Sequence, residues 1–370
     1  MRSVKFVSRV DAWAAGRLGL ILRYTNGVWE NFPSGSDQNL FAVTALGDSD
    51  AWAVGSAGTI LHFNGDKWNP SPQAGQITLL DLNGAAFLNS SNGWIVGGNP
   101  PQGGIILKWD GVAWSSVYTC SEALYGIAIV RSDCIWFCGE NRKLVKFDGA
   151  GFSDGPVLLG GSGTWWALSF PYQNQGWVVG DSGSIGRFTA GNWNLVASGV
   201  AEHLHGICLL ADPTRGYIVG ENGVRLLYGS DTISLEARGG EDLFSVDMPN
   251  DLEGAAVGGQ TSGRLLMLRG ISEEADLSRV RVFPNPIDPR QDRFLSLDRL
   301  PQDVTKIGIY TVLGEPVAAL GDGITLSPVT GVAAWSGQIN GRAAATGVYI
   351  YRIETAGGKS RRGVFMVQKR

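Results

Sequence analysis

The sequence predicts an all-β protein, in which a seven-bladed β-propeller is followed by a small C-terminal β-sandwich. The main observation is a recurring phrase: an aromatic residue three places before a glycine, then a short turn and an apolar run. Its copies are Trp13–Gly16, Trp52–Gly55, Trp94–Gly97, Trp136–Gly139, Trp177–Gly180, Tyr217–Gly220 and a degenerate Ala255–Gly258. Successive glycines lie 39, 42, 42, 41, 40 and 38 residues apart. A period near 40 with four short apolar segments is typical of propeller blades, because one blade cannot bury both of its faces alone.

Composition also favours an all-β fold. Of the 370 residues, 53 are glycine and 13 are tryptophan, and charged residues make up only 17%. A chain rich in turn-forming and aromatic residues, with no long helical pattern, is typical of all-β proteins. The length suffices for two domains. No apolar run approaches the roughly 20 residues that cross a bilayer, so no membrane span is expected.

The second repeat shows the expected strands of one blade. They are residues 40–46, 50–55, 58–63 and an outer strand that opens at 67–69. The Asn-Gly pair at 64–65 is a strong hairpin signal, because both residues tolerate positive φ. Trp52 and Val54 stand two apart and share one face of their strand, which predicts packing on a neighbouring blade. We therefore interpret the ring of aromatic residues as packing between blades rather than as a cage for sugars.

The seventh repeat is incomplete. Its expected strands are 243–248, 254–258 and 264–268, and no Gly-x-x-Trp outer strand follows. Residues 4–8 already fill the inner-strand position of the first blade. Propellers commonly close when one terminus completes the last blade. Either residues 271–277 do this or a strand upstream of Met1 does, and the low β-propensity of residues 271–277 favours the second.

Three segments follow from these patterns. The propeller is expected at residues 1–270, a polar and acidic linker at 271–278, and the sandwich at 279–370. In the last segment, apolar runs alternate with glycine and proline turns, which predicts about seven short strands. Pro284 and Pro286 cannot lie in a central strand, so they mark an edge or the entry into the domain.

The propeller part, roughly residues 3–270, resembles the bacterial propellers related to photosystem II assembly factors and to Asp-box (BNR-like) repeats. The shared motifs are 52–55 (Trp-Ala-Val-Gly), 58–61 (Gly-Thr-Ile-Leu) and 65–68 (Gly-Asp-Lys-Trp). The full Asp-box is absent, since residues 62–64 are His-Phe-Asn where its serine and aspartate would stand. The Arg-Ile-Pro strand of sialidases is absent as well. The resemblance therefore implies a fold rather than an activity.

The last 90 or so residues resemble a second family, the immunoglobulin-like (Ig-like) domain of flagellar hook-capping proteins and of the C-terminal sorting domains of type IX secretion cargo. The matching motifs, in order, are 282–286 (Val-Phe-Pro-Asn-Pro), 304–310, 314–317, Trp335 and 347–351 (Gly-Val-Tyr-Ile-Tyr). This resemblance implies an Ig-like sandwich in a bacterial protein that is secreted or held at the cell surface. Its C-terminal domain would meet secretion or surface machinery.

Charge is unevenly distributed along the chain. Residues 277–370 carry 13 Lys+Arg against 7 Asp+Glu, and residues 1–276 carry 17 against 27, so the net charges are +6 and −10. An acidic propeller is a poor match for a phosphate backbone, so no nucleic-acid partner is expected. Basic proteins, cations and neutral glycans remain compatible with it.

The candidate ligand-binding residues occupy equivalent points of blades 4, 5 and 6. Acids follow the blade glycine in a hairpin turn, and variable residues begin the inner strands near the channel mouth. The set is Tyr125, Glu140, Trp166, Asp181, His205 and Glu221. The repeat geometry should bring these residues to one sector of the channel, and aromatic faces with acids suit sugars or cationic groups. Solvated turns and packing between blades are the structural alternatives.

Other chemistry is weakly supported. The four cysteines have no Cys-x-x-Cys spacing, so zinc is not expected, and a disulfide between Cys120 and Cys134 stays open. His203 and His205 share a strand face without an evident third ligand, so neither a metal nor a cofactor is expected. The leading hypothesis is a non-catalytic, secreted or cell-surface binding or scaffold protein whose ligand is a protein or glycan. The alternative is a glycan hydrolase or lyase, although no acid pair of defined separation can be identified.

Overall fold

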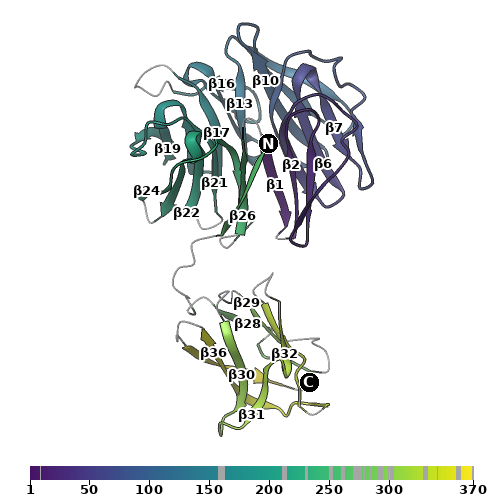
Figure 1. Cartoon of the computed structure of the whole chain (residues 1–370), viewed down its shortest axis with the longest axis vertical. Coiled ribbons are helices and arrows are strands. Elements are labelled where there is room, and N and C mark those ends of the chain that lie inside the picture. The colour runs from purple at the N-terminus through teal and green to yellow at the C-terminus, as the bar shows by residue number, and fades with distance from the viewer. Residues whose placement is uncertain are drawn as a thin grey trace. The chain divides into compact units, whose positions relative to one another are not determined.

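The computed structural model shows an all-β chain that divides into two compact units, Met1–Gly270 and Ile271–Arg370 (Figure 1). The residues described are 1–8, 10–156, 163–210, 215–229, 232–249, 253–259, 263–269, 277, 280–283, 285–289, 295–298, 300, 304–327, 332–339, 341–355 and 360–368. In this part of the chain, no helix is both long and apolar enough to cross a membrane.

The first unit is a seven-bladed propeller, as the repeat predicts, and each blade is an antiparallel sheet with its strands in sequence order. Blade 1 contains β1 (Ser3–Ser8), β2 (Asp11–Ala15), β3 (Ile21–Thr25) and β4 (Val28–Asn31), and blade 2 contains β5 (Leu40–Gly47), β6 (Asp50–Gly55), β7 (Ile60–Phe63) and β8 (Trp68–Pro70). Blade 3 contains β9 (Leu82–Asn89), β10 (Asn92–Asn99), β11 (Gly103–Trp109) and β12 (Trp114–Cys120), and blade 4 contains β13 (Leu124–Arg131), β14 (Cys134–Gly139), β15 (Leu144–Phe147) and β16 (Phe152–Asp154). Blade 5 contains β17 (Trp165–Tyr172), β18 (Gln175–Gly180), β19 (Ile185–Thr189) and β20 (Asn192–Val196), and blade 6 contains β21 (Leu204–Leu209), β22 (Arg215–Gly220), β23 (Arg225–Gly229) and β24 (Thr232–Ala237). Blade 7 has three strands among the described residues, β25 (Leu243–Asp247), β26 (Glu253–Gly258) and β27 (Arg264–Arg269).

The repeated aromatic residue packs each blade onto the next. Trp52 of blade 2 is only 4% exposed, and its ring contacts those of Phe87, Trp109 and Trp114 in blade 3 at centroid distances of 5.0, 5.3 and 5.6 Å. Trp177 of blade 5 makes the same kind of contact in blade 6. The interpretation of these residues as packing between blades is confirmed.

A short 3-10 turn follows the second strand in four of the blades. These turns are η1 (Ser56–Gly58), η2 (Glu140–Arg142), η3 (Asp181–Gly183) and η4 (Glu221–Gly223). Their central residue has a positive φ of 50–54°. In η1 and η3, a Cβ on the final glycine would collide with the backbone oxygens of Thr78 and Val200 respectively, so only glycine fits there without movement. The strand expected at 58–63 is shorter because its first residue belongs to this turn.

Side chains of blade 7 close the ring onto blade 1. Asp247 Oδ2 accepts a hydrogen bond from the Phe6 amide at 2.7 Å, and Asp247 Oδ1 pairs with Lys5 Nζ at 3.0 Å. Ser245 Oγ accepts from the Val4 amide at 3.3 Å. Of the residues predicted to add an outer strand to blade 7, only Leu277 lies within the described part, so that assignment stays a prediction.

The second unit contains one eight-stranded sheet in the order β28-β29-β33-β32-β31-β30-β36-β37. Its strands are β28 (Arg281–Phe283), β29 (Leu295–Asp298), β30 (Val304–Thr311), β31 (Pro316–Leu320), β32 (Gly323–Ser327), β33 (Val332–Trp335), β36 (Gly347–Thr355) and β37 (Ser360–Val367), with a separate ribbon of β34 (Gln338–Ile339) and β35 (Arg342–Ala343). A bridge from Ile287 to Val367 connects the segment after β28 with the opposite edge of the sheet. The sheet is thus barrel-like and differs from the two separate layers expected, and the Ig-like assignment stays a prediction.

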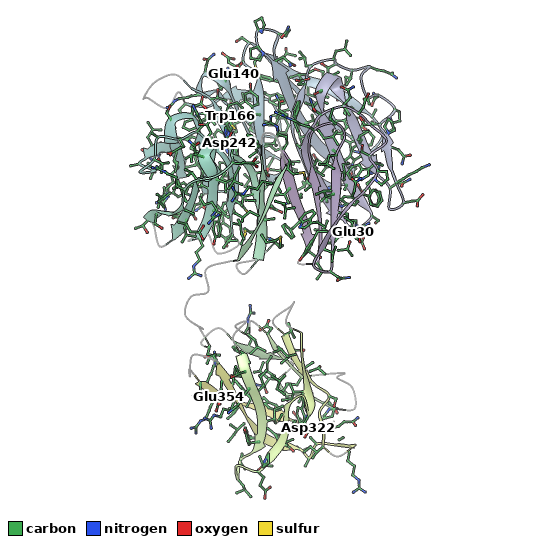
Figure 2. All side chains as sticks on the ribbon, in the orientation of Figure 1. Glu30, Glu140, Trp166, Asp242, Asp322 and Glu354 are labelled. Atoms are coloured by element: carbon green, nitrogen blue, oxygen red, sulfur yellow. The ribbon has the colours of Figure 1, made fainter. Side chains whose placement is uncertain are left out.

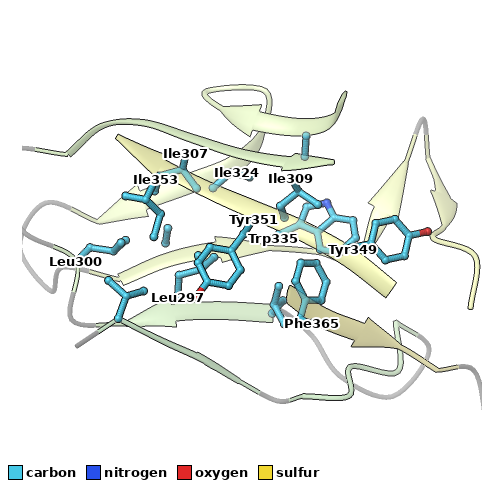
Figure 3. Packing of buried hydrophobic residues seen from close by; sticks show 14 of the residues in the cluster. Leu297, Leu300, Ile307, Ile309, Ile324, Trp335, Tyr349, Tyr351, Ile353 and Phe365 are labelled. Atoms are coloured by element: carbon cyan, nitrogen blue, oxygen red, sulfur yellow. The ribbon is translucent and has the colours of Figure 1, made fainter. Parts of the chain in front are cut away.

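The barrel-like sheet encloses its own core. Trp335 is fully buried against Tyr349 and Phe365, and Leu297, Ile309 and other aliphatic residues complete the cluster (Figure 3). Burial of this apolar area stabilises the unit without any disulfide. All four cysteines of the chain are free thiols, and the pairing of Cys120 with Cys134 that the sequence left open is not formed.

Candidate functional site

Blades 4 to 7 and blade 1 together form an arc of contacting side chains, each at or just before the start of an inner strand. The members of this aromatic arc are Tyr125, Trp166, His205, Phe244 and Arg2. Neighbouring rings lie 4.5 Å (Tyr125–Trp166), 5.5 Å (Trp166–His205) and 5.4 Å (His205–Phe244) apart between centroids. The Arg2 guanidinium lies 4.2 Å from the centre of the Phe244 ring. Equivalent positions of the repeat thus meet around one sector of the ring, as the sequence predicted for the first three.

Asp181 is the hydrogen-bonding centre of the site. Its Oδ1 accepts a hydrogen bond from Trp166 Nε1 and lies beside His203 Nδ1, both at 2.7 Å, and its Oδ2 accepts from the Thr164 amide at 2.7 Å. Burial alone would raise the pKa of this carboxyl, but the hydrogen bonds from Trp166 and Thr164 outweigh burial and lower the pKa. Asp181 is therefore a carboxylate at neutral pH that holds the Trp166 indole in place.

His203 connects Asp181 with Glu221. Its Nε2 lies 3.9 Å from Glu221 Oε2, and the same oxygen accepts from the His203 amide at 3.4 Å. Sequence reasoning left His203 out of the candidate set. The sequence did contain a signal for His203, because it stands two residues before the arc residue His205. At the same repeat position in other blades, Asp81 and Asp242 each accept a hydrogen bond from a turn residue of the preceding blade.

Two titratable members of the arc are neutral near pH 7. Burial, assisted by the negative charges of Glu140 and Asp181, raises the pKa of Tyr125 to about 12, so its phenol keeps its proton. Burial lowers the pKa of the His205 imidazole below its ordinary value. The arc therefore offers aromatic faces and a phenolic hydroxyl, with the guanidinium of Arg2 at one end and carboxylates beside it.

The six predicted residues are not equally close to one another. Tyr125, Trp166 and His205 form consecutive contacts, Trp166 binds Asp181, and His203 connects Glu221 with Asp181. Trp166 and Glu140 are labelled in Figure 2. Glu140 lies one blade away, where its Oε2 accepts from the Ala123 amide at 3.0 Å. Each of the three acids thus fixes backbone in its own blade.

A metal centre needs several ligating side chains that lie close together. Among the described residues, no group of three His, Cys, Asp or Glu side chains could hold an ion. The arrangement is instead suited to contacts with aromatic faces and to hydrogen bonds with polar or cationic groups.

Comparison with known proteins gives the fold and no family. No protein-family model and no curated protein matches the sequence. Among solved structures, the chain is similar to PorZ of Porphyromonas gingivalis, an essential bacterial surface component of the type IX secretion system. The identity is 16% and the TM-score 0.58, over 99% of this chain and 59% of PorZ. The chain therefore corresponds to about three fifths of the length of that protein.

Two other structures match the propeller unit. YCF48 bound to a D1 peptide has 14% identity and a TM-score of 0.59, over 73% of this chain and 91% of YCF48. YCF48 from Cyanidioschyzon merolae has 13% identity and a TM-score of 0.58, over 72% and 95% of the two chains. At these identities the similarity establishes the propeller fold alone.

Proposed function

We propose that this chain is a non-catalytic binding or scaffold protein, secreted or held at the cell surface, whose propeller binds a segment of a partner protein. The observation that carries the proposal is the convergence of Tyr125, Trp166 and His205 beside the fixed carboxylate of Asp181. Aromatic faces next to carboxylates suit backbone amides and cationic side chains. That YCF48 has been solved with a D1 peptide supports a protein ligand over a glycan.

The C-terminal unit would serve sorting, anchoring or docking. Its motifs resemble those of the type IX sorting domains, and the similarity to PorZ, a surface component of that secretion system, extends over nearly the whole chain. We infer that this unit is a variant of the Ig-like sorting domain despite its barrel-like sheet, because its motifs occur in the same order as in that family.

Glycan hydrolysis is less well supported than binding. A general acid needs a carboxyl with a raised pKa, whereas the pKa of Asp181 is lowered. Glu140 and Glu221 each accept a hydrogen bond from a backbone amide. These contacts suit a role in shaping the surface rather than in proton transfer.

A double variant tests the proposal. Peptide and glycan libraries are first screened against the full chain, and the best ligand is then measured against Trp166→Ala combined with Glu221→Gln. We expect binding to fall at least tenfold with a nearly unchanged melting temperature, because Trp166 is only half-buried. The matched control is Phe41→Ala, the same ring position in blade 2, combined with Glu30→Gln on an outer strand. Undiminished binding in the Trp166 and Glu221 double variant, or a ligand bound by the C-terminal unit alone, would contradict the proposal.

A further inference from the structure

Arg142 occupies a turn position at which blades 2, 5 and 6 have glycine. The third residue of the 3-10 turn is glycine in η1, η3 and η4, but in η2 it is Arg142, with φ of 56°. A side chain in this left-handed region is strained, and such strain is typically retained where a residue has a function. The substitution is specific to blade 4 among these turns.

Among the residues that the structure describes, the charge of Arg142 has no counter-ion. The residue is only 8% exposed, and its guanidinium lies 4.9 Å from the centre of the Trp165 ring. Nη2 donates to Ser184 Oγ at 2.8 Å, while Nη1 has no hydrogen-bond partner. Within the described ranges Arg142 forms no ion pair, and in the sequence residues 157–162 include no aspartate or glutamate. A buried and unpaired charge is unfavourable unless a ligand compensates it.

A pocket adjoins Arg142. It has a volume of about 620 Å³ and is lined by Arg142, by the turn and outer strand of blade 5, and by Arg238. Its lining includes the polar Ser184 and Ser198 and the apolar Ile185, Leu195, Val196 and Val200. Arg238 is already paired, since its Nε lies 3.0 Å from Glu202 Oε1. In the described part of the chain, the positive charge of Arg142 is therefore unmatched beside the apolar side chains of this pocket.

We propose that this pocket binds a carboxylate that is attached to an apolar group, with Arg142 as its charge partner. A guanidinium pairs with a planar carboxylate through two parallel hydrogen bonds. One unmatched positive charge requires a single negative charge, and Glu202 nearby disfavours a phosphate dianion. The site is separate from the aromatic arc and does not rest on its function. The carboxylate can come from a peptide C-terminus or from an acidic side chain.

Small probes distinguish these sources on the full chain. N-acetyl-leucine represents a C-terminus, N-acetyl-glutamic acid α-amide represents a side chain, and N-acetyl-leucine amide is the uncharged control. The readout is the methyl NMR signals of Leu195, Val196 and Val200, with those of Val112 as a distant reference. We expect saturable shifts with at least one acid, and at least tenfold weaker binding in Arg142→Gln. Arg131→Gln, at an exposed arginine of the same blade that pairs with Asp133, should bind as the unmodified chain does. Equal binding of the amide, tighter binding of inorganic phosphate, or unchanged binding in Arg142→Gln would overturn the proposal.

A glycine variant separates binding from folding. Arg142→Gly restores the residue that the other turns carry, so it relieves both the strained backbone and the buried charge. We expect the melting temperature to stay the same or rise while carboxylate binding is lost. If Arg142→Gly instead lowers the melting temperature and the unmodified chain binds no carboxylate, Arg142 is a structural residue and the proposal is wrong.

Discussion

The carboxylate of Asp181 both stabilises the backbone of its blade and holds an aromatic side chain of the candidate site in place. Its Oδ2 accepts from the Thr164 amide and so fixes the start of the inner strand, while its Oδ1 holds the Trp166 indole. A carboxylate that accepts several hydrogen bonds is rigid as well as charged. The aromatic arc is therefore preorganised, which would reduce the entropy lost on binding the proposed ligand.

At the residue scale, His205 should make stability depend on pH. Burial lowers its pKa in the folded state, although the nearby Glu221 and Asp242 oppose this effect. The unfolded chain binds a proton near pH 6.5, before the folded protein does, so the free energy of unfolding should fall as pH drops below about 6.5. Urea unfolding at pH 7.5 and 5.5 would measure this loss, and His205→Gln should reduce it. An imidazole that titrates at or above pH 6.5 in NMR would contradict the prediction.

At the scale of the elements, the blade interfaces should depend on the repeated aromatic residues. Trp52 and Trp177 are 4% and 1% exposed and pack against the next blade. Their replacement by alanine should lower the free energy of unfolding by about 3–5 kcal/mol, because the cavity left behind cannot collapse fully. Trp166→Ala, at a half-buried tryptophan, is the matched control and should cost much less. A loss below about 1 kcal/mol at both buried sites in chemical denaturation would refute their role in packing.

The last blade should be the least stable. In the described residues β27 pairs with β26 alone, whereas β23 of blade 6 lies between β22 and β24. Amides that lack a second strand exchange faster, because opening them breaks fewer hydrogen bonds. Hydrogen exchange followed by mass spectrometry should therefore show faster uptake in β27 than in β23. Equal protection of the two strands, together with slow exchange at residues 271–277, would instead support that segment as the outer strand.

The sequence predicted the positions of strands well wherever the blade motif recurs. The strands expected at 40–46 and 50–55 match β5 and β6 within one residue, because a glycine and an aromatic residue mark six of the seven repeats. Contacts between distant segments are not indicated by any such motif in the sequence. The bond from Phe6 to Asp247 that closes the ring depends on residues 241 positions apart, and no local pattern announces it. The same limit applies to the second unit, where the sequence indicated strands and predicted a two-layer sandwich rather than the single barrel-like sheet of the structure.

At the scale of the whole molecule, each unit has its own core. The hydrophobic cluster of the second unit contains only residues 277–367, and the clusters of the propeller contain residues 1–268. A unit with a self-contained core can fold alone. The two parts also carry opposite net charge in the sequence, −10 for residues 1–276 and +6 for residues 277–370. The two parts therefore differ in net charge as well as in having separate cores.

The two units should accordingly be separable by a protease that cuts after glutamate. Glu273 and Glu274 lie in the predicted linker, whereas Leu277 is 6% exposed and belongs to the core of the second unit. Limited digestion should first release a folded fragment that begins near residue 275, detected by mass spectrometry and by a cooperative melting curve. A fragment that begins at residue 279 should be less stable by about 2–4 kcal/mol, since it loses the buried Leu277 side chain. First cuts inside the propeller, or an unfolded fragment from residue 275, would show that the units depend on one another.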